Sequence, residues 1–478
     1  YYWEYELTTV GNEQTLGLAV EQFVPTGAWT VSGVIGYRKS GDKVDGRVGG
    51  GSGSYGDAYA NGENVGICIK AGKIYFRNEG VWQNSADIDA ETGEAYDDIT
   101  GFVCPALTNS SPTGTNAIIL NTGQSDFAYT PPTGTKMVAT HDLPAPAVKD
   151  ASKFYQEDNF TGTGGELVRT YTDAAGGAVS PDLSMVKDTD GTGDFNTVDS
   201  TRGATKEFAF GENEAASTVA EGIKSFDSSG ITLGTDSAYN ASSSVNSAYN
   251  WVEGVTPGFE ISSYTGSAAE KTITHSLGAA PACIWIRNIT DSVNVAMYHQ
   301  GLNGGSTPED FVLEIGATAE ANDATAFFDY APTSSNFKVG ASNLTNGSSD
   351  TIIAYIFAEV PGFSSFGNYL GNANADGPFI YMGFRPAFVL TKRRDGSAHQ
   401  PAIFPHNNPA APYNPTRGMD TVDGESFTGT SRYVDFLSNG MKIRTADNTC
   451  NGSGFNMVYC AFAEFPFGGS GVAQARAR

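Results

Sequence analysis

Long apolar stretches are missing from this sequence of 478 residues. A helix that crosses a bilayer needs about 18 or more consecutive apolar residues, and the best run here, Ile352 to Ala358, is only as long as a strand. We therefore expect no membrane insertion. Because 40% of the residues are hydrophobic, with 22 Tyr and 28 Phe, the chain can still bury a core and is not a disordered polymer.

Basic residues are scarce. The chain has 28 Lys and Arg against 53 Asp and Glu, which gives a net charge of −25. Nucleic-acid backbones and anionic membrane surfaces repel such a chain, so we expect no nucleic-acid partner. The one dense basic cluster, Lys392-Arg393-Arg394, is typical of the shoulder of a hairpin. The acidic excess is spread along the chain, as on a solubilising surface.

Cysteines are few, and no pair of them has the CxxC or zinc-site spacing. Cys68, Cys283 and Cys460 each lie in an apolar run, where a cysteine acts as a small hydrophobic side chain. We expect reduced, buried cysteines in a protein that is assembled in a reducing cytosol.

Catalytic motifs are also missing. Neither G-x-S-x-G nor H-E-x-x-H occurs, and the five histidines are scattered. A G-x-G-x-x-G match at residues 51–56 follows no βαβ pattern and indicates a flexible loop. We expect no cofactor and no enzymatic activity. Paired carboxylates that could hydrolyse a glycan stay open, because acidic residues are common here.

Glycine, in contrast, is abundant, with 58 residues, and Ser, Thr and Asn accompany it. These residues disfavour helix interiors, so the chain should be all-β. In residues 1–143, strand candidates recur at intervals of about 8–12 residues, which predicts a β-sandwich. They include residues 3–7, 16–20, 29–37, 64–70, 73–78, 102–107 and 117–121. Ala71-Gly72 predicts a tight hairpin turn between two of them.

The limits of this first unit are marked at both ends. The chain begins at Tyr1, already inside an alternating strand, so we expect the first domain to be incomplete at its N-terminus. Proline clusters near Pro131 and Pro144 mark its exit. Residues 144–151 are then expected to be a linker.

The remainder of the chain repeats itself. The segment Pro281-Ala-Cys-Ile-Trp-Ile-Arg-Asn288 returns 105 residues later as Pro386–Arg393, and Pro181 starts an earlier copy. Tyr355-Ile-Phe-Ala-Glu359 returns at the same spacing as Cys460–Glu464. Constant spacing of several landmarks indicates tandem copies of one module. The copies are module 1 (residues 152–256), module 2 (257–361) and module 3 (362–468), followed by a tail at 469–478.

Several features inside the modules can be interpreted. Each module is long enough for its own core. Gly230 and its counterparts at the start of the penultimate strand predict a left-handed turn. Glu359 and Glu464 end apolar strands and should either emerge into solvent or form intermodule salt bridges. Residues Glu212–Lys224 are the one helical candidate.

Some segments resemble a known family. The segments Tyr2–Tyr5, Gly62–Ile67, Gly72–Gly80 and Ile119–Gln124 resemble a SPRY domain. Residues Val198–Lys206 and the Phe-Ala-Glu module ends are similar to repeats that follow SPRY domains in structural proteins of tailed bacteriophages.

This resemblance implies a concanavalin A-like β-sandwich followed by three tandem β-sandwich-like modules. It implies a non-enzymatic structural component of a phage virion, in the tail, fibre or capsid surface, assembled in the host cytoplasm. The expected partners are other virion proteins, further copies of the chain in a homo-oligomer such as a trimer, and a host-surface glycan. A bacterial surface adhesin or lectin is the alternative, and a polysaccharide-degrading tailspike is a third.

Two sets of side chains are candidates for ligands. Trp82, and Tyr37 with Arg38, are the best loop candidates for stacking on sugars, although packing at the rim of the sandwich is the favoured interpretation. Asp188, Asp190 and Asp194 surround two glycines, and clustered carboxylates of this kind can wrap Ca²⁺. The corresponding loops of the other copies lack the cluster, so a solvated hairpin loop is favoured and no metal is expected.

Overall fold

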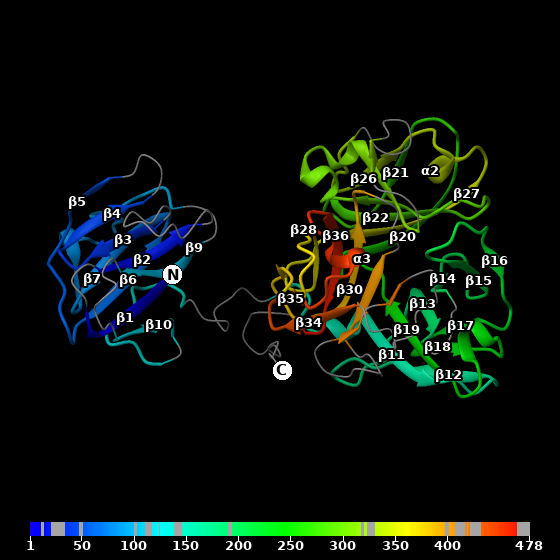
Figure 1. The fold of residues 1–478 in the computed structure, drawn as a ribbon, viewed down its shortest axis with the longest axis horizontal. Helices are drawn as coiled ribbons and strands as arrows, with labels where there is room; N and C mark the ends of the chain where they lie inside the picture. Colours follow the sequence, from blue (N-terminus) through cyan, green and yellow to red (C-terminus); the bar gives the residue numbers. More distant parts are fainter. Residues whose placement is uncertain are drawn as a thin grey trace. The chain divides into compact units, whose positions relative to one another are not determined.

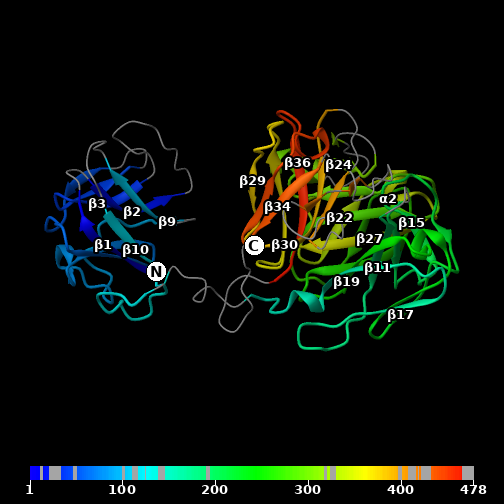
Figure 2. The ribbon, with the colours of Figure 1, turned by 60° about the horizontal axis from the view of Figure 1, so that its bottom comes forward.

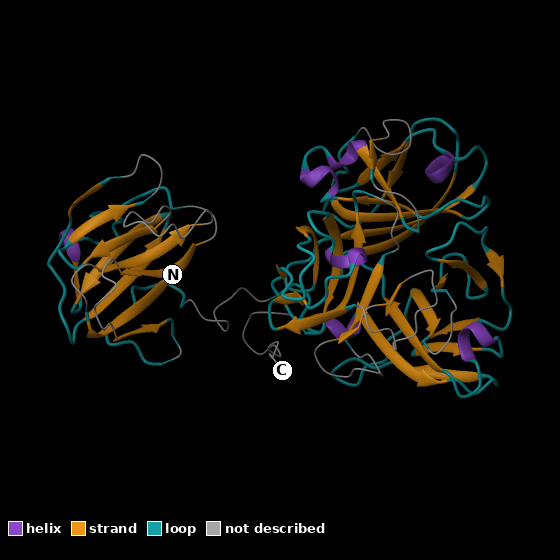
Figure 3. Ribbon diagram, in the orientation of Figure 1, coloured by secondary structure: helices purple, strands orange, loops and turns teal. Residues whose placement is uncertain are grey.

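The computed structural model describes most of the chain and divides it into two compact units, Tyr1–Pro144 and Ala145–Arg478. The described residues are 1–10, 14–20, 34–46, 51–99, 103–109, 117–123, 125–137, 146–189, 194–316, 320–322, 330–396, 401–406, 416–417, 419–420 and 432–465. In these ranges strands dominate and helices are short, as Figure 3 shows. The described part contains no helix that is long and apolar enough to span a bilayer. The predicted all-β fold is confirmed.

The N-terminal unit is a sandwich of two five-stranded antiparallel sheets, with strand orders β10-β1-β6-β7-β8 and β5-β4-β3-β2-β9. It is drawn in blue and cyan in Figure 1. Its elements are β1 Tyr2–Thr9, β2 Gln14–Val20, β3 Val34–Arg38, β4 Asp42–Asp45, β5 Ser52–Ser54, β6 Asn64–Lys70, β7 Lys73–Asn78, β8 Val81–Trp82, η1 Gln83–Ser85, β9 Val103–Asn109 and β10 Ala117–Asn121.

Alternation along the strands builds the core of this sandwich. Trp3, Tyr5 and Leu7 of β1 point into one cluster of buried side chains, while Tyr2 belongs to another, as a period of two residues requires. The strands predicted at 64–70, 73–78 and 117–121 are confirmed. At the predicted hairpin turn, Ala71 and Gly72 have φ values of 51° and 75°, which match a type I′ turn.

The C-terminal unit contains three sandwiches with the same topology, and each pairs a larger sheet with a smaller one. The sheets are β11-β19-β13-β14-β15-β16 with β12-β18-β17 in module 1, β20-β27-β22-β23-β24-β25 with β21-β26 in module 2, and β28-β36-β30-β31-β33 with β29-β35-β34-β32 in module 3. The pairing of the first with the last strand has the same register in every copy, which joins Tyr155 to Trp251, Phe259 to Phe357 and Ser364 to Phe462.

Module 1 comprises η3 Ala151–Lys153, β11 Tyr155–Thr161, β12 Leu167–Thr170, β13 Leu183–Asp188, β14 Asn196–Asp199, β15 Lys206–Ala209, β16 Ser217–Thr218, β17 Ile223–Asp227, β18 Gly230–Leu233, α1 Ser237–Asn240 and β19 Val245–Trp251. Module 2 comprises β20 Phe259–Thr265, β21 Lys271–Thr274, β22 Pro281–Asn288, β23 Ala296–His299, η4 Leu302–Gly305, η5 Pro308–Asp310, β24 Phe311–Glu314, β25 Ala321–Asn322, β26 Asn336–Val339, α2 Asn343–Asn346 and β27 Thr351–Ala358. Module 3 comprises β28 Ser364–Leu370, β29 Phe379–Tyr381, β30 Pro386–Arg393, β31 Ala402–Pro405, β32 Thr416–Arg417, β33 Met419–Asp420, β34 Tyr433–Leu437, β35 Gly440–Ile443, α3 Asn448–Asn451 and β36 Asn456–Ala463.

A short helix holds the same place in each copy and ends in a buried asparagine. The Nδ2 atom of Asn451 donates to the carbonyl oxygens of Asn374 and Thr445 at 2.8 and 2.6 Å. Its Oδ1 atom accepts from the backbone N–H of Asn372 at 2.9 Å. Asn240 and Asn346 make the equivalent contacts, so one side chain satisfies three backbone groups in every module.

The central strands of the larger sheets, such as β27 and β36, are buried on both faces. In β27, Ile352, Ala354 and Ile356 face the core inside module 2. The alternate residues Ile353, Tyr355 and Phe357 face a second core that all three modules share. Modules 1 and 2 therefore have the separate cores expected from the sequence. The common core is an addition that explains why these strands carry no polar face.

Figures 1 and 2 show the three modules grouped around this common core. Its centre contains Trp251, Phe357 and Phe462, which occupy equivalent positions in the three copies. The ring centroids of Phe462 lie 5.8 Å from those of both Trp251 and Phe357. Each module thus contacts both of the others, and we name the contacts the 1–2 seam, the 2–3 seam and the 3–1 seam.

Two expectations differ from the structure. Glu212–Lys224 forms no helix, and instead contains β16 and the start of β17, because it spans an edge strand rather than a helical face. At Gly230, where the sequence predicts a conformation that favours glycine, φ is 146°. A Cβ atom there would also lie 1.9 Å from the carbonyl oxygen of Arg169. Val148 and Ala151, expected in the linker, are buried in the common core.

Candidate functional site at a module seam

A glutamate follows the last strand of each module, and in modules 1 and 2 it connects the module to the next one. At the 1–2 seam, Glu253 Oε1 accepts a hydrogen bond from the backbone N–H of Ile261. At the 2–3 seam, Glu359 Oε2 accepts from the backbone N–H of Phe366 at 3.0 Å. Ile261 and Phe366 are the third residues of the first strands of their modules. The same contact therefore joins two pairs of modules, as a hydrogen bond instead of a salt bridge.

The third copy of this glutamate is used differently. Glu464 forms an ion pair with Arg385, and its Oε1 atom lies 3.2 Å from Nε2 of His406. In module 2, alanine and glutamine (Ala280 and Gln300) precede Pro281 and follow β23, at the places that Arg385 and His406 hold in module 3. Module 3 has thus replaced neutral residues by basic ones around its glutamate.

A pocket of about 160 Å³ lies at this 3–1 seam. Its lining comes from the start of module 1 and, in module 3, from the start of β30 and the ends of β31 and β36. The lining residues are Ser152, Tyr155, Gln156, Glu157, Ala387, His406, Ala463 and Glu464. Glu157 occupies the position equivalent to Ile261 and Phe366. A second carboxylate therefore stands where the other seams have an apolar side chain.

The aromatic floor of the pocket belongs to the common core. Tyr155 is 5% exposed, and its ring lies 6.1 Å from Phe462 and 6.0 Å from Phe388, measured between centroids. Burial raises the pKa of Tyr155 well above its ordinary value, so its hydroxyl stays protonated. In the described part of the chain this hydroxyl has no hydrogen-bond partner.

The lining of the pocket is mixed. It combines two carboxylates, an amide, a hydroxyl and an imidazole with two alanine methyl groups and the ring of Tyr155. The Glu464 carboxylate is already paired with the Arg385 guanidinium. Polar groups placed around an apolar surface can fix the orientation of a small ligand.

The residues predicted as sugar contacts in the N-terminal unit do not form one surface. Tyr37 is 0% exposed and stacks on Phe76 with ring centroids 5.3 Å apart. Its hydroxyl donates to the backbone carbonyl of Asp57. Arg38, the next residue of β3, is exposed, because successive side chains of a strand point to opposite faces. The ring of Tyr37 therefore has no exposed face for a sugar, which corrects its predicted role.

Trp82 is half-buried on β8 and packs at the rim of the sandwich. The guanidinium carbon of Arg77 lies 5.1 Å from the centroid of the Trp82 ring and 4.9 Å from that of Tyr2. Arg77 also forms a buried ion pair with Glu4 at 3.0 Å. Rim packing, the alternative weighed for Trp82, accounts for these contacts.

The calcium candidate lies only in part within the described residues. Asp188 ends β13 and Asp194 precedes β14, so the two flank the connection between these strands, while Asp190 lies outside the described residues. Burial raises the pKa of Asp194. Among the residues that the structure describes, no three His, Cys, Asp or Glu side chains are grouped to hold a metal ion.

The basic cluster Lys392-Arg393-Arg394 ends β30 and is not a surface patch. Lys392 and Arg393 are buried, at 0% and 3% exposure. Arg394 forms an ion pair with Glu320 of module 2, so the cluster contributes to the 2–3 seam.

Sequence reasoning selected Glu464 as an unusual strand end but missed Arg385 and His406. The signal was present in the repeat itself, as the two positions where module 3 has a basic residue and module 2 a neutral one.

Comparison with known families gives one match. The model of a family described as a domain of unknown function (DUF7483) matches residues 150–466, which span the three modules. A search of curated proteins finds no match to the chain.

Proposed function

The chain belongs to the DUF7483 family, and we propose that it is a non-enzymatic structural component of a phage virion, exposed on a tail, fibre or capsid surface. The observation that carries the proposal is the common core, because three copies of one module are joined into a single body through buried aromatic rings. Glutamate hydrogen bonds across two seams add to this rigidity. The resemblance of the N-terminal unit to SPRY domains of phage proteins supports the same assignment.

The proposed work of such a body is to hold contacts with other virion proteins and with the host surface. Many copies on one particle multiply weak individual contacts by avidity. Because one chain contains three equivalent modules, a single copy of it can contact a three-fold symmetric partner at three equivalent places. Light scattering of the purified chain distinguishes this arrangement, which needs only a monomer, from the homotrimer expected from the family resemblance.

A second candidate function, binding of a host-surface glycan, is favoured by the pocket at the 3–1 seam. A glycan array probed with the full chain tests it. We expect binding that is lost in Glu464→Gln and kept in Glu359→Gln, which removes the equivalent carboxylate at the 2–3 seam. Equal binding by both variants would exclude the pocket.

Fractionation of a lysate tests the structural function. We expect an antibody against the chain to detect it in density-purified particles from the bacterium that encodes it, at a constant ratio to the other particle proteins. Recovery in the cell envelope would instead support the adhesin or lectin. Release of reducing sugars from host polysaccharide by the purified chain would support the tailspike.

A further inference from the structure

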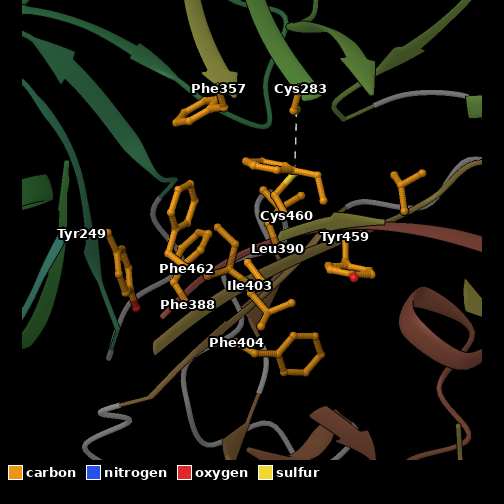
Figure 4. Packing of buried hydrophobic residues seen from close by; sticks show 14 of the residues in the cluster. Tyr249, Cys283, Phe357, Phe388, Leu390, Ile403, Phe404, Tyr459, Cys460 and Phe462 are labelled. Atoms are coloured by element: carbon orange, nitrogen blue, oxygen red, sulfur yellow. Dashed lines mark hydrogen bonds between the residues drawn. The ribbon is translucent and has the colours of Figure 1, made fainter. Parts of the chain in front are cut away.

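Two thiols meet in the common core at the 2–3 seam. Cys283 lies on β22 of module 2 and Cys460 on β36 of module 3, and their Sγ atoms are 3.8 Å apart (Figure 4). Both residues are 0% exposed. In the sequence the two cysteines are 177 residues apart, so spacing alone gives no sign that they meet.

The repeat shows that the strand register brings these two positions face to face at two seams. The strand register makes Cys283 equivalent to Phe388, and Cys460 equivalent to Tyr249. At the 3–1 seam, Tyr249 and Phe388 are in ring contact, with centroids 5.6 Å apart. The 2–3 seam thus places two thiols where the 3–1 seam places two rings.

We propose that Cys283 and Cys460 are a latent disulfide that ties module 2 to module 3 when the protein meets an oxidant. Each thiol gives up its proton, and the pair gives up two electrons to a two-electron oxidant such as a diazenedicarboxamide, which becomes the hydrazine. A disulfide has a sulfur–sulfur distance of about 2.05 Å, so the two sulfurs approach each other by a side-chain rotation and a small shift of the strands.

Burial keeps the pair reduced until the seam opens, because neither thiol can be reached by an oxidant in the closed core. Burial raises the pKa of the Cys283 thiol well above its ordinary value. At Cys460 burial acts in the same direction, but contact with Cys283 and His299 outweighs it and lowers the pKa of this thiol to about 6. His299 Nδ1 accepts from the backbone N–H of Gly301, and its Nε2 faces the carbonyl oxygen of Tyr459 at 2.9 Å. Because the thiolate is the reactive form, Cys460 is the thiol that reacts first once transient opening of the seam admits the oxidant.

In the proposed virion component this reaction forms a covalent cross-link between modules 2 and 3 after assembly. That role rests on the proposed function. The pair stays reduced while the chain folds in a reducing cytosol. Release of particles into an oxidising medium then allows the bond to form. The disulfide chemistry itself belongs to the isolated chain and does not depend on the particle.

Peptide mapping of the full chain tests the cross-link. The protein is treated with diamide below its unfolding temperature, remaining thiols are blocked with N-ethylmaleimide, and the digest is analysed without reduction. We expect one linked pair of peptides that contain Cys283 and Cys460, lighter by two hydrogens than the separate peptides. Cys450, which is buried in module 3, should be recovered as its N-ethylmaleimide adduct. Blocked or singly oxidised Cys283 and Cys460, without the linked pair, would overturn the proposal.

Thermal unfolding supplies the second readout. Oxidation closes a long loop, so the melting temperature of the wild-type chain should rise by about 5 °C or more, and dithiothreitol should reverse the rise. Cys283→Ser should abolish the response, and Cys450→Ser is the matched control that keeps it. If either variant fails to fold, the peptide map of the wild-type chain still shows whether Cys283 and Cys460 are cross-linked. A linked pair in the purified chain but reduced thiols in isolated particles would contradict the role in the virion and leave the chemistry standing.

Discussion

The 1–2 seam and the 3–1 seam use the same backbone positions with opposite chemistry. At the 1–2 seam, the hydroxyl of Tyr355 donates to Asp199 Oδ2 at 2.7 Å, and Arg202 forms an ion pair with the same carboxylate. At the 3–1 seam, the equivalent positions hold Tyr249 and Pro405. Among the residues that the structure describes, the hydroxyl of Tyr249 has no hydrogen-bond partner, and its ring packs on Phe388 instead.

Equivalent positions hold a polar network at one seam and an aromatic contact at the other. The common core therefore depends on the register of the strands more than on any one interaction. A polar network requires every member, because a buried charge that loses its partner is costly. An aromatic contact tolerates changes of detail as long as the volume is filled. The two seams should therefore respond differently to matched substitutions.

The largest effect is expected at the aromatic seam. Phe388→Ala removes a buried ring that lies 5.2 Å from Trp251 and 5.6 Å from Tyr249, between centroids. The loss of apolar burial and the resulting cavity should lower the free energy of unfolding by about 3–5 kcal/mol. Urea unfolding of the full chain measures this. Because no charge is involved, the loss should be equal at low and high salt, and a strong salt dependence would contradict the aromatic character of the seam.

A somewhat smaller effect is expected at the polar seam. Asp199→Asn keeps the volume but removes the negative charge beside Arg202, whose side chain is 4% exposed. We expect a loss of about 3 kcal/mol in the free energy of unfolding, because the guanidinium stays buried without its counter-charge. The same urea titration measures it. Replacing both residues, as Asp199→Asn with Arg202→Met, should recover part of the loss. If the double variant has a lower free energy of unfolding than Asp199→Asn alone, the unpaired charge of Arg202 is not the cause of the loss.

The matched tyrosines give the sharpest comparison. Tyr355→Phe removes a buried hydrogen bond and leaves Asp199 with one donor fewer, so we expect a loss of about 1–2 kcal/mol. Tyr249→Phe removes a hydroxyl without a partner, and should be neutral or slightly stabilising. Differential scanning calorimetry of the two variants measures both. Equal losses would show that the two seams do not differ in the way the structure describes.

Sequence reasoning predicted the elements whose determinants are local. The hairpin at Ala71-Gly72 and its flanking strands follow from alternation and turn chemistry. The module repeat follows from landmarks such as Pro281 and Pro386. The common core could not be predicted in this way, because spacing does not say which faces of different modules meet. The apolar positions on both faces of β27 and β36 were its only signal.

The candidate site was harder to predict, for physical reasons. Tyr37 was misplaced because the phase of β3, which decides between core and solvent, depends on its neighbours in the sheet. Glu464 was noticed as a strand end, but its partners Arg385 and His406 come from a preceding turn and another strand. A comparison of copies, position by position, would have found both.

A last comparison separates the seams by pH. Burial, with Asp182 and Glu260 nearby, raises the pKa of Glu253 from its ordinary value of 4.5 to about 7, although the N–H of Ile261 acts against it. The folded state therefore binds this proton more tightly than the unfolded state. The resulting stabilisation is complete below about pH 4.5 and is lost as the pH rises through 7. Melting temperatures of the wild type and Glu253→Gln, compared between pH 4.5 and 8, measure it. The variant should match the wild type at the acidic end and exceed it at the basic end, because glutamine still accepts the hydrogen bond and carries no charge. A difference between the two proteins that stays constant with pH would assign the pH dependence to groups outside the 1–2 seam.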